Sequence, residues 1–388
     1  MFKSIPDSLL RGTVSVTSET ELAAKLAKGK PLHVKLGVDP TTRDLHLGHT
    51  VCLRKMRAFQ DLGHTGILII GDFTAAIGDP SGRTETRKML SREEILANAK
   101  TYQDQAFKVL DPGKTQVRFN SEWLNPFVSS GKLLEYLPRV TLARLTERED
   151  FKKRISEGKP ISMLEVCYPI FQGYDSVATQ ADVELGATDQ TFNLLFGRDV
   201  QRDFGQEPQV TITAPILVGT DGVRKMSKSY DNYIAVLDEP GAMFGKTMSV
   251  SDETMWNWIE VLTSLDLSQL KTIHPMEAKK TLAREIVSSF YDAASADAAQ
   301  EEFSRVHSEG ELPADIPEFK LSKGRKIYLS QVLHQIGLLR SRKEAQRKIA
   351  EGAIRLEGQV VKEDIILDAE EPILLTFGRR GFCRIIPA

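Results

Sequence analysis

Several residue types are scarce in this sequence, and each shortage narrows what the protein can be. The three cysteines, Cys52, Cys167 and Cys383, are odd in number and far apart. This spacing fits neither a disulfide framework nor a zinc site. No run approaches the roughly 18 apolar residues that a membrane-spanning helix needs. The N-terminal residues M-F-K-S-I-P-D-S also lack the apolar segment of a signal peptide. We therefore expect a cytoplasmic protein with no membrane segment.

An excess of charge of one sign is also missing. The formal net charge is -2 over 388 residues, so a uniformly basic nucleic-acid-binding surface is excluded and any RNA contact must come from local patches. Hydrophobic residues make up 41% of the chain and charged residues 27%, which is ordinary for a soluble globular protein. The length predicts two or three domains with a sizeable core.

The first informative motif is D-P-T-T-R-D-L-H-L-G-H at residues 39–49. Leu32–Val38 alternates like a strand, and a helix is predicted to begin near Leu47. His46 and His49 then lie at the unpaired N–H groups of a helix N-terminus, which attracts anions. Taken alone, two histidines beside a glycine are more often structural.

The second motif is K-M-S-K-S at residues 225–229. Lys225 and Lys228, with the small Ser227 between them and Gly222 before, predict a mobile cationic loop that can close over a triphosphate. A loop with two lysines is by itself usually a solvated turn. Because both motifs occur in one chain, in this order and each beside a predicted strand end, they together predict a nucleotide site.

A strand-then-helix rhythm between Leu32 and about Leu217 predicts a parallel sheet. The predicted strands are Leu32–Val38, Ile67–Ile70, Val117–Phe119 and Val210–Ile216. Ligands of such sheets bind beyond the carboxyl ends of the strands. The segments D-P-T-T, G-D-P-S-G at 78–82 and N-S-E-W-L at 120–124 all follow predicted strands, so they are expected to meet in one crevice.

The rest of the chain is predicted to be largely helical up to a linker. Residues of about 130–190 interrupt the rhythm with helical patterns, and apolar spacing predicts further helices around Trp256, Ile259 and Leu262 and around Leu282, Ile286 and Phe290. Two prolines in polar surroundings then predict a linker at 311–319.

The C-terminal segment has a different character. Tyr328–Ile336 and a second segment, capped by Ser341 and ended by Gly352, are predicted helices. The turn Glu357-Gly358 then joins two short strands. Basic residues lie on and beside the second helix, and they are Arg340, Arg342, Lys343, Arg347 and Lys348. Such a run alone is usually a solvated face, but within two capped helices it predicts a surface for RNA phosphates.

The pair of motifs resembles the two signatures of class I aminoacyl-tRNA synthetases, which make aminoacyl-adenylates. Y-P-I-F-Q-G-Y-D at 168–175 and G-A-T-D-Q at 186–190, together with G-D-P-S-G and N-S-E-W-L, resemble bacterial tyrosyl-tRNA synthetases of the K-M-S-K-S subgroup. The resemblance runs from about residue 30 to the C-terminus.

This resemblance implies an α/β fold in three parts. A Rossmann-like parallel-sheet catalytic domain spans 1–220, with a helical connective insertion at about 130–190 that carries the amino-acid pocket and a dimer contact. The K-M-S-K-S loop, an α-helical domain and the linker span 221–320. A small α+β RNA-binding domain, similar to a ribosomal protein, spans 327–388.

The resemblance also implies a homodimeric enzyme that ligates L-tyrosine to tRNA(Tyr) through a tyrosyl-adenylate, with ATP as a substrate, Mg²⁺ beside it and no tightly bound cofactor. The carboxylate attacks the α-phosphate of ATP, so the catalyst needs cations and donors and no base. The residues expected to act in this step are Thr41, His46, His49, Lys225 and Lys228. The residues that the family places around ATP add Gly37, Asp39, Gly48, Asp189 and Leu217.

The tyrosine pocket is likewise implied by the family pattern. Asp79, Tyr168 and Gln172 match its ammonium ligands, Asp175 its phenol acceptor, and Gln190 a further substrate contact. Judged without the family, Asp79 would be a turn-forming residue before proline, and Tyr168 would be a core aromatic.

Two positions depart from the pattern, and a third has two possible roles. Lys35 stands where many bacterial members have a tyrosine that donates to the substrate hydroxyl, and Leu36 replaces a cysteine that touches the ribose. Cys52 stands where a helix residue near the ribose is expected, although a buried structural thiol fits as well.

Three rival functions were weighed against this one. The tryptophanyl enzyme shares the fold and both signatures, but Gln172, Tyr174 and the C-terminal domain argue against it. An RNA-binding relative without catalytic activity is disfavoured by the intact histidines and lysines of the two motifs. A small nucleotidyltransferase fits neither the length nor the C-terminal segment.

Overall fold

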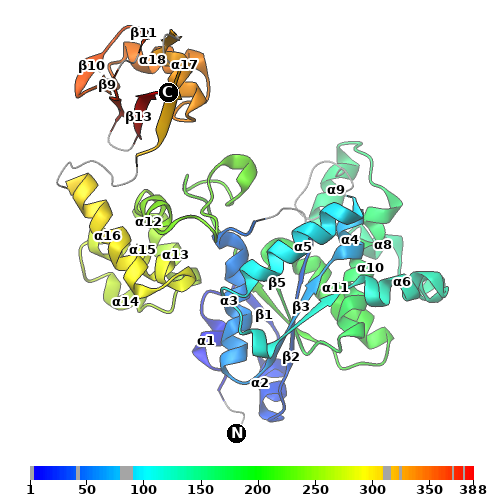
Figure 1. The fold of residues 1–388 in the computed structure, drawn as a ribbon. Helices are drawn as coiled ribbons and strands as arrows, with labels where there is room; N and C mark the ends of the chain where they lie inside the picture. Colours follow the sequence, from blue (N-terminus) through cyan, green and yellow to red (C-terminus); the bar gives the residue numbers. More distant parts are fainter. Residues whose placement is uncertain are drawn as a thin grey trace. The chain divides into compact units, whose positions relative to one another are not determined.

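The computed structural model describes residues 4–40, 44–78, 91–308, 316–322, 326–368, 371–378 and 381–388. Thr41 and Asp79, both predicted site residues, lie outside these ranges. The chain divides into two compact units, Met1–Asp297 and Ala298–Ala388 (Figure 1). The predicted division into three parts stays a prediction. In the described part of the chain no helix is both long enough and apolar enough to cross a lipid bilayer.

The first unit is built on a six-stranded sheet in the order β1-β6-β5-β2-β3-β4. Its strands are β1 Ser15–Thr17, β2 His33–Val38, β3 Thr65–Ile70, β4 Thr115–Phe119, β5 Val183–Ala187 and β6 Val210–Ala214. β1 is antiparallel to β6, and all other neighbours are parallel. From β2 in the middle, the chain runs outward to β4, returns to β5 on the other side of β2, and continues to β6. This is the doubly wound order of a Rossmann-like fold, so the predicted fold class is confirmed.

Four of these strands were predicted and two were not. β3 holds the buried run Ile67–Ile70, as a strand covered on both faces should. β6 ends at Ala214, two residues before the predicted end. β5 reads V-E-L-G-A, and its glutamate and glycine are weak strand formers, so the strand was hidden inside the stretch predicted as helical.

Helices cover both faces of this sheet (Figure 1). α3 packs on β2, β3 and β5, and α11 packs on β5 and β6. The α-helices from residue 7 to residue 308 are α1 Asp7–Leu10, α2 Glu19–Ala27, α3 Leu47–Asp61, α4 Asp72–Ile77, α5 Arg92–Ala106, α6 Ser121–Ser129, α7 Lys132–Tyr136, α8 Leu142–Leu145, α9 Glu149–Ser156, α10 Met163–Ala178, α11 Thr191–Asp203, α12 Pro240–Met248, α13 Asp252–Leu262, α14 Leu267–Leu270, α15 Pro275–Phe290 and α16 Ala293–Ser308. Short 3-10 turns are η1 Pro112–Lys114, η2 Leu137–Arg139, η3 Thr188–Gln190 and η4 Lys228–Tyr230.

Two helical groups extend the sheet. Between β4 and β5, helices α6 to α10 pack with α11 around a core that includes Phe127, Phe151 and Ile170. This packing fixes α10, which carries several predicted site residues. Beyond the sheet, α13 and α15 bury Ile259 and Ile286 as their spacing predicted. The fully buried tryptophan of α13 is Trp258 and not the half-buried Trp256, and its Nε1 donates to the Val218 carbonyl at 3.0 Å.

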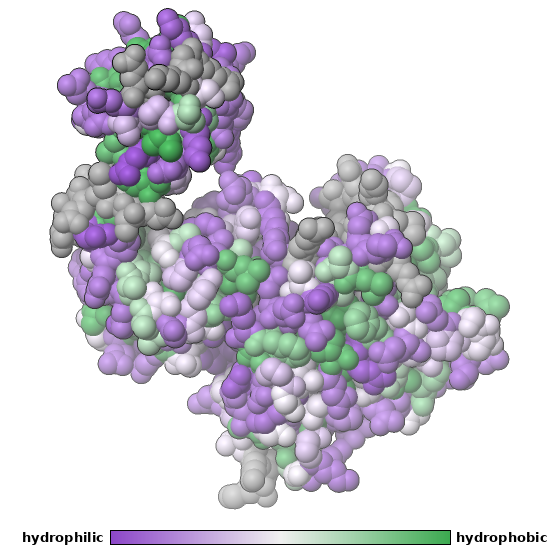
Figure 2. All heavy atoms as spheres, in the orientation of Figure 1, coloured by the Kyte–Doolittle hydropathy of each residue, from purple (hydrophilic) through white to green (hydrophobic). Residues whose placement is uncertain are grey.

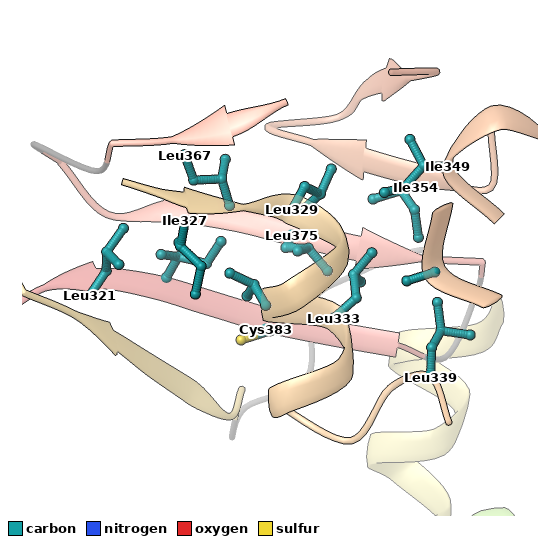
Figure 3. Packing of buried hydrophobic residues seen from close by; sticks show 13 residues of the cluster. Leu321, Ile327, Leu329, Leu333, Leu339, Ile349, Ile354, Leu367, Leu375 and Cys383 are labelled. Atoms are coloured by element: carbon teal, nitrogen blue, oxygen red, sulfur yellow. The ribbon is translucent and has the colours of Figure 1, made fainter. Parts of the chain in front are cut away.

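The second unit contains a five-stranded sheet in the order β10-β9-β12-β13-β7 and a two-stranded sheet, β11-β8. Its elements after α16 are β7 Glu318–Leu321, β8 Ile327–Tyr328, α17 Leu329–Gln335, α18 Arg342–Ala350, β9 Ile354–Leu356, β10 Gln359–Val361, β11 Ile366–Leu367, β12 Ile373–Phe377 and β13 Gly381–Pro387. Leu329 and Leu333 of α17, Ile349 of α18 and Leu375 of β12 lie together in its core (Figure 3).

The predicted local structure of this unit is confirmed in most respects. The Ser341 side chain accepts from the Glu344 N–H at 3.2 Å and so caps α18. Glu357 and Gly358 both have positive φ, as the turn between β9 and β10 requires. The predicted linker was wrong at its end, because β7 begins at Glu318 and pairs in parallel with β13. Residues 311–315 of that linker lie outside the described ranges.

Candidate active site

A cavity opens where strands β2 and β5 separate. The two strands pair only through Val34 with Val183 and Lys35 with Glu184, after which β2 continues beside β3 and β5 beside β6. Such a switch point is where doubly wound sheets bind ligands. The cavity has a volume of about 330 Å³. Its lining includes the predicted site residues Gly37, Asp39, Gly48, His49, Tyr168, Gln172, Asp175, Asp189 and Gln190.

A second cavity of about 510 Å³ adjoins the first. Its lining joins the first turn of α3, the segment after β6 and the K-M-S-K-S loop, and it includes His46, Leu217, Lys225 and Lys228. Gly48, His49, Cys52, Ala187 and Asp189 line both cavities. The two motifs that are distant in sequence therefore meet, and their shared space is continuous with the switch-point cavity.

His46 and His49 cap helix α3 themselves. Nδ1 of His46 accepts from the Gly48 N–H at 3.2 Å, and Nδ1 of His49 accepts from the His46 N–H at 3.2 Å. A Cβ on Gly48 would lie 3.0 Å from the His46 ring, so a side chain there would disturb the cap. The sequence predicted open N–H groups at this helix end, but these two are occupied by the imidazoles.

Both imidazoles are neutral at physiological pH. Burial lowers the pKa of His46 to about 2, with His49 and Lys228 adding to the effect, and burial lowers the pKa of His49 to about 4. Since Nδ1 accepts a hydrogen bond in each ring, the ring proton resides on Nε2. The pair therefore offers a ligand in the second cavity two neutral N–H donors.

The K-M-S-K-S loop is folded around Asn232. The buried Asn232 side chain donates to the carbonyl of Lys225 at 3.1 Å and accepts from the Ser227 N–H at 2.8 Å. Nζ of Lys228 lies 2.6 Å from Oδ2 of Asp44, so an ion pair joins the second motif to the first. The Lys225 side chain is exposed.

Asp175 lies at the end of the first cavity, with its carboxylate buried among hydrogen-bond donors. Nε1 of Trp123 donates to Oδ1 at 2.7 Å, and Nδ2 of Asn120 lies 3.4 Å from Oδ2. Burial raises the pKa of Asp175 to about 7, while the nearby Lys35 acts in the opposite direction. The side chain is 4% exposed, so a ligand that reaches it meets an acceptor shielded from bulk water.

Helix α10 presents Tyr168, Gln172 and Asp175 on one face, because they are four and three residues apart. The Tyr168 hydroxyl donates to Oδ2 of Asp39 at 2.9 Å, and the Gln172 amide donates to Oε1 of Glu184 at 3.2 Å. Hydrogen bonds thus join α10 to Asp39, which follows β2, and to Glu184 of β5.

The remaining predicted residues are placed as follows. Gln190 lies on η3 and accepts from Asn193 at 3.1 Å, and Asp189 beside it is exposed. A Cβ on Gly37 would meet no protein atom within 4 Å, so the glycine leaves the cavity open where any side chain would enter it. Cys52 lies between the cavities, and burial raises the pKa of its thiol to about 12. Leu36 is buried in the lining of the first cavity.

Lys35 does not line either cavity. Its side chain is fully buried and donates to the Gln172 carbonyl at 2.9 Å and to Oγ of Ser176 at 2.7 Å, while Oε1 of Glu184 lies 2.8 Å away. All three N–H bonds of the ammonium are thereby used. Lys35 therefore has no donor left for a ligand in the first cavity.

The predicted basic residues lie in the second unit. Arg342, Lys343 and Arg347 are exposed on α18, as is Arg340 just before it. Lys348 is half-buried and forms an ion pair with Glu351 at 2.6 Å, and the Arg342 guanidinium lies over the Tyr328 ring at 5.0 Å.

Sequence reasoning gave no role to several residues that shape the cavities. Thr74, Asn120 and Glu184 line the first cavity, whereas Asp44, Trp123 and Asn232 contact Lys228, Asp175 and the K-M-S-K-S loop. The clearest signal in the sequence was a charged residue inside a central strand. Lys35 lies in β2, which was predicted, and Glu184 lies in β5, which was not. Because a buried charge requires a partner, each of them indicates an ion pair or a set of hydrogen bonds inside the protein.

Residues 27–308 match the family model described as tRNA synthetases class I (W and Y). A tyrosine–tRNA ligase of Aquifex aeolicus is 49% identical over 390 residues, which cover 98% of this chain and 99% of that protein. A tyrosine–tRNA ligase of Moorella thermoacetica is 49% identical over 391 residues, which cover 97% of this chain and 94% of that protein. The chain belongs to the class I tyrosyl-tRNA synthetase family.

A solved member of this family shares the fold at much lower identity. The C-terminally truncated mitochondrial tyrosyl-tRNA synthetase of Aspergillus nidulans superposes with a TM-score of 0.64 at 20% identity, covering 76% of this chain and 92% of that chain. At this identity the likeness concerns the fold alone. The predicted membership of the tyrosyl-tRNA synthetases is confirmed by the curated relatives.

Proposed function

We propose that this chain ligates L-tyrosine to tRNA(Tyr) at the expense of ATP, in two steps through a tyrosyl-adenylate, as a homodimer in the cytoplasm. The observation that carries the substrate choice is the buried Asp175 carboxylate, held by Trp123 at the end of a cavity that begins at the sheet's switch point. A phenol needs an acceptor, and a shielded carboxylate is a strong one.

The amino-acid site uses the face of α10 and the end of β2. Asp175 accepts the phenol hydroxyl, while Gln172 and Tyr168, one and two helical turns before Asp175 on α10, receive the ammonium group with Asp79. Gln190 contacts the substrate from η3. Tyr168 is held in place by its hydrogen bond to Asp39, so the site needs little rearrangement on binding.

The first step needs donors and cations around the triphosphate. Nε2–H groups of His46 and His49, with Thr41, donate to phosphate oxygens as charge redistributes, and Lys225 and Lys228 neutralise the departing pyrophosphate. The nucleotide is held by Gly37, Asp39, Gly48, Asp189 and Leu217.

A Mg²⁺ ion accompanies the nucleotide. In the described part of the chain no group of three His, Cys, Asp or Glu side chains is arranged to hold a metal. When bound, it neutralises phosphate charge.

The second step transfers the tyrosyl group to the tRNA 3′ end, and the second unit binds the RNA. Its surface in Figure 2 is largely hydrophilic. The proposed phosphate contacts are Arg340, Arg342, Lys343, Arg347 and Lys348 on and beside α18.

The homodimer is supported by apolar side chains exposed on the helices between β4 and β5. Leu134 of α7, Leu142 of α8, Ile155 of α9 and Met163 of α10 are between 57% and 72% exposed. Burying such residues against a second copy removes apolar surface from water.

The test of the function is ATP–pyrophosphate exchange with tyrosine, tryptophan and phenylalanine in turn. Exchange that depends on tyrosine alone is the expected result. Exchange with tryptophan would assign the site to the tryptophanyl enzyme, and no exchange with any of the three would leave an RNA-binding relative without activity.

We expect Lys228→Ala to slow tyrosyl-adenylate formation on the order of 10² to 10³-fold, with tyrosine affinity nearly unchanged. The reason is that Lys228 meets charge that develops only in the transition state. Single-turnover rates with saturating ATP measure this. Lys246→Ala is the matched control, because Lys246 also lies 2.6 Å from an aspartate, Asp238, but lines neither cavity. A defect limited to tyrosine binding would exclude this role for Lys228.

We expect tyrosine affinity to increase as the pH rises through about 7. The pKa of Asp175 is raised to about 7, so below that pH the group is protonated and one oxygen no longer accepts the phenol freely. The tyrosine phenol, with a pKa of about 10, does not titrate between pH 6 and pH 8. Calorimetric titration without ATP between pH 6 and pH 8 measures the effect.

Two variants control this pH dependence. Asp175→Asn should make the affinity independent of pH in this window. Trp123→Phe should move the midpoint upward, because the indole N–H stabilises the carboxylate. A wild-type affinity that stays constant from pH 6 to pH 8 would exclude Asp175 as the titrating group.

A further inference from the structure

The buried ion pair between Lys35 and Glu184 lies at the point where the amino-acid cavity begins. The two residues are the last register partners of β2 and β5, so their side chains share one face of the sheet. Their exposed fractions are 0% and 1%, and Nζ lies 2.8 Å from Oε1. Glu184 lines the first cavity, whereas Lys35 lies behind it and lines neither cavity.

Glu184 is surrounded by donors. Oε1 also accepts from Nε2 of Gln172 at 3.2 Å, and Oε2 accepts from Oγ of Ser176 at 3.2 Å and from the amide of Gln209. Lys35 in turn donates to the backbone carbonyl of Gln172. The pair therefore holds both the main chain and the side chain of Gln172.

The chemistry of a carboxylate fixes how the Gln172 amide is oriented. A carboxylate only accepts hydrogen bonds, so the group of Gln172 that faces Glu184 must be the NH₂. The amide oxygen is then directed away from Glu184, and Gln172 lines the cavity. An oxygen there accepts a hydrogen bond from an ammonium group, whereas the reversed amide would oppose it with a second donor.

We propose that the Lys35–Glu184 ion pair is a positioning device that holds the Gln172 amide oxygen toward the cavity and thereby makes the site select substrates with a free α-ammonium group. This inference rests on the proposed function. Lys35 lines neither cavity, and the pair acts on the ammonium group through Gln172. The negative charge of Glu184 is already balanced by Lys35, so the direction of the amide carries the selectivity.

The experiment compares L-tyrosine with its des-amino analogue, 3-(4-hydroxyphenyl)propionate, by calorimetric titration. Both ligands carry the phenol and the carboxylate, so the ratio of their dissociation constants reports the ammonium contact. Lys35→Met combined with Glu184→Met removes both charges together, because losing one alone leaves a buried charge unpaired. We expect the ratio to fall about 10- to 100-fold, the loss of one hydrogen bond to a charged group.

Glu184→Gln is the matched variant. Its amide oxygen can still accept from Lys35 and Gln172 in place of Oε1. The Lys35 charge is then unbalanced, so we expect a less stable protein that keeps the wild-type ratio. An unchanged ratio in a folded double variant would mean that the pair is only structural, and a lost ratio in Glu184→Gln would mean that the charge matters and not the orientation. Either result overturns the proposal. If the double variant does not fold, a lost ratio in Glu184→Gln still contradicts it.

Two further measurements distinguish a failure of this inference from a failure of the proposed function. They are competition by L-phenylalanine and the binding of both ligands by the wild-type protein. Competition by L-phenylalanine reports the phenol end. Its affinity relative to tyrosine should be nearly unchanged in the double variant, because the two charges removed act on Asp175 in opposite directions. If the wild-type protein binds neither tyrosine nor the des-amino analogue, the proposed function fails. If the wild-type protein binds both ligands, and the ratio is unchanged in the double variant or lost in Glu184→Gln, only the positioning role of the ion pair is excluded.

Discussion

Asp175→Asn and Asp175→Ala are expected to lose most of the discrimination between tyrosine and phenylalanine. Asp175 is 4% exposed and receives the Trp123 N–H at 2.7 Å, so phenylalanine would leave it without a substrate donor in a site closed to water. Sites that bind a substrate hydroxyl reject the analogue without it by about 10⁴ to 10⁵, and the upper figure is the known value for a tyrosyl-tRNA synthetase. Without the acceptor, the ratio should fall toward about 10².

The measurement is the ratio of kcat/KM values for tyrosine and phenylalanine in pyrophosphate exchange. Asp203→Asn is the control, because Asp203 also accepts from a phenol, the Tyr136 hydroxyl at 3.0 Å, but lines neither of the two cavities. It should keep the wild-type ratio. Wild-type selectivity in both Asp175 variants would show that another group recognises the hydroxyl.

The central sheet was largely predictable because its strands carry their own signal. Ile67–Ile70 is apolar on both faces, as a strand covered on both sides should be, and Gly37 and Asp39 mark the end of a second strand, β2, whose pattern is equally clear. β5 was not predictable from pattern, since Glu184 is stable there only because Lys35 and Gln172, distant in sequence, supply its partners. Contacts between residues that are far apart in the chain leave no periodic pattern in the sequence.

The site was predictable to the extent that it is built from local motifs. His46 and His49 were expected at a helix N-terminus, and they do cap α3. Their neutral state and their use of Nδ1 as an acceptor depend on burial, which the sequence does not report. The same holds for Lys228, whose partner Asp44 comes from the other motif.

Lys35 illustrates the limit most clearly. Its position suggested a changed contact to the substrate phenol, whereas its three donors are all used by protein groups below the cavity. The interatomic distances place Lys35, which stands where many relatives have a tyrosine, against the Gln172 carbonyl and not against the substrate phenol.

Deleting residues 316–388 is expected to separate the two activities of the protein. Pyrophosphate exchange should be spared, and most tRNA charging should be abolished. The cut has to precede β7, because Glu318–Leu321 pairs with β13 and belongs to the sheet of the second unit. Among the described residues, both cavities are lined only by positions up to Ser229, so adenylate formation keeps its complete set of side chains. A charge-assisted hydrogen bond contributes about 1.5 to 3 kcal/mol, so losing three at the lower figure costs roughly 10³-fold in kcat/KM for tRNA.

Replacing Arg342, Lys343 and Arg347 with alanine should reproduce part of this defect and reduce the salt dependence of tRNA binding by about 0.7 to 0.9 in slope for each lost phosphate contact. The matched control replaces Arg355, Lys362 and Arg384, which removes the same charge from exposed positions of the same unit outside α18. If binding depended only on net charge, both triple variants would weaken it equally, since long-range attraction does not distinguish their positions. If the α18 surface contacts phosphates directly, only the α18 variant should lose affinity for tRNA. Equal charging of tRNA by the full-length and the truncated protein at physiological salt would exclude the second unit as the RNA-binding domain, without affecting the assignment of the adenylation site.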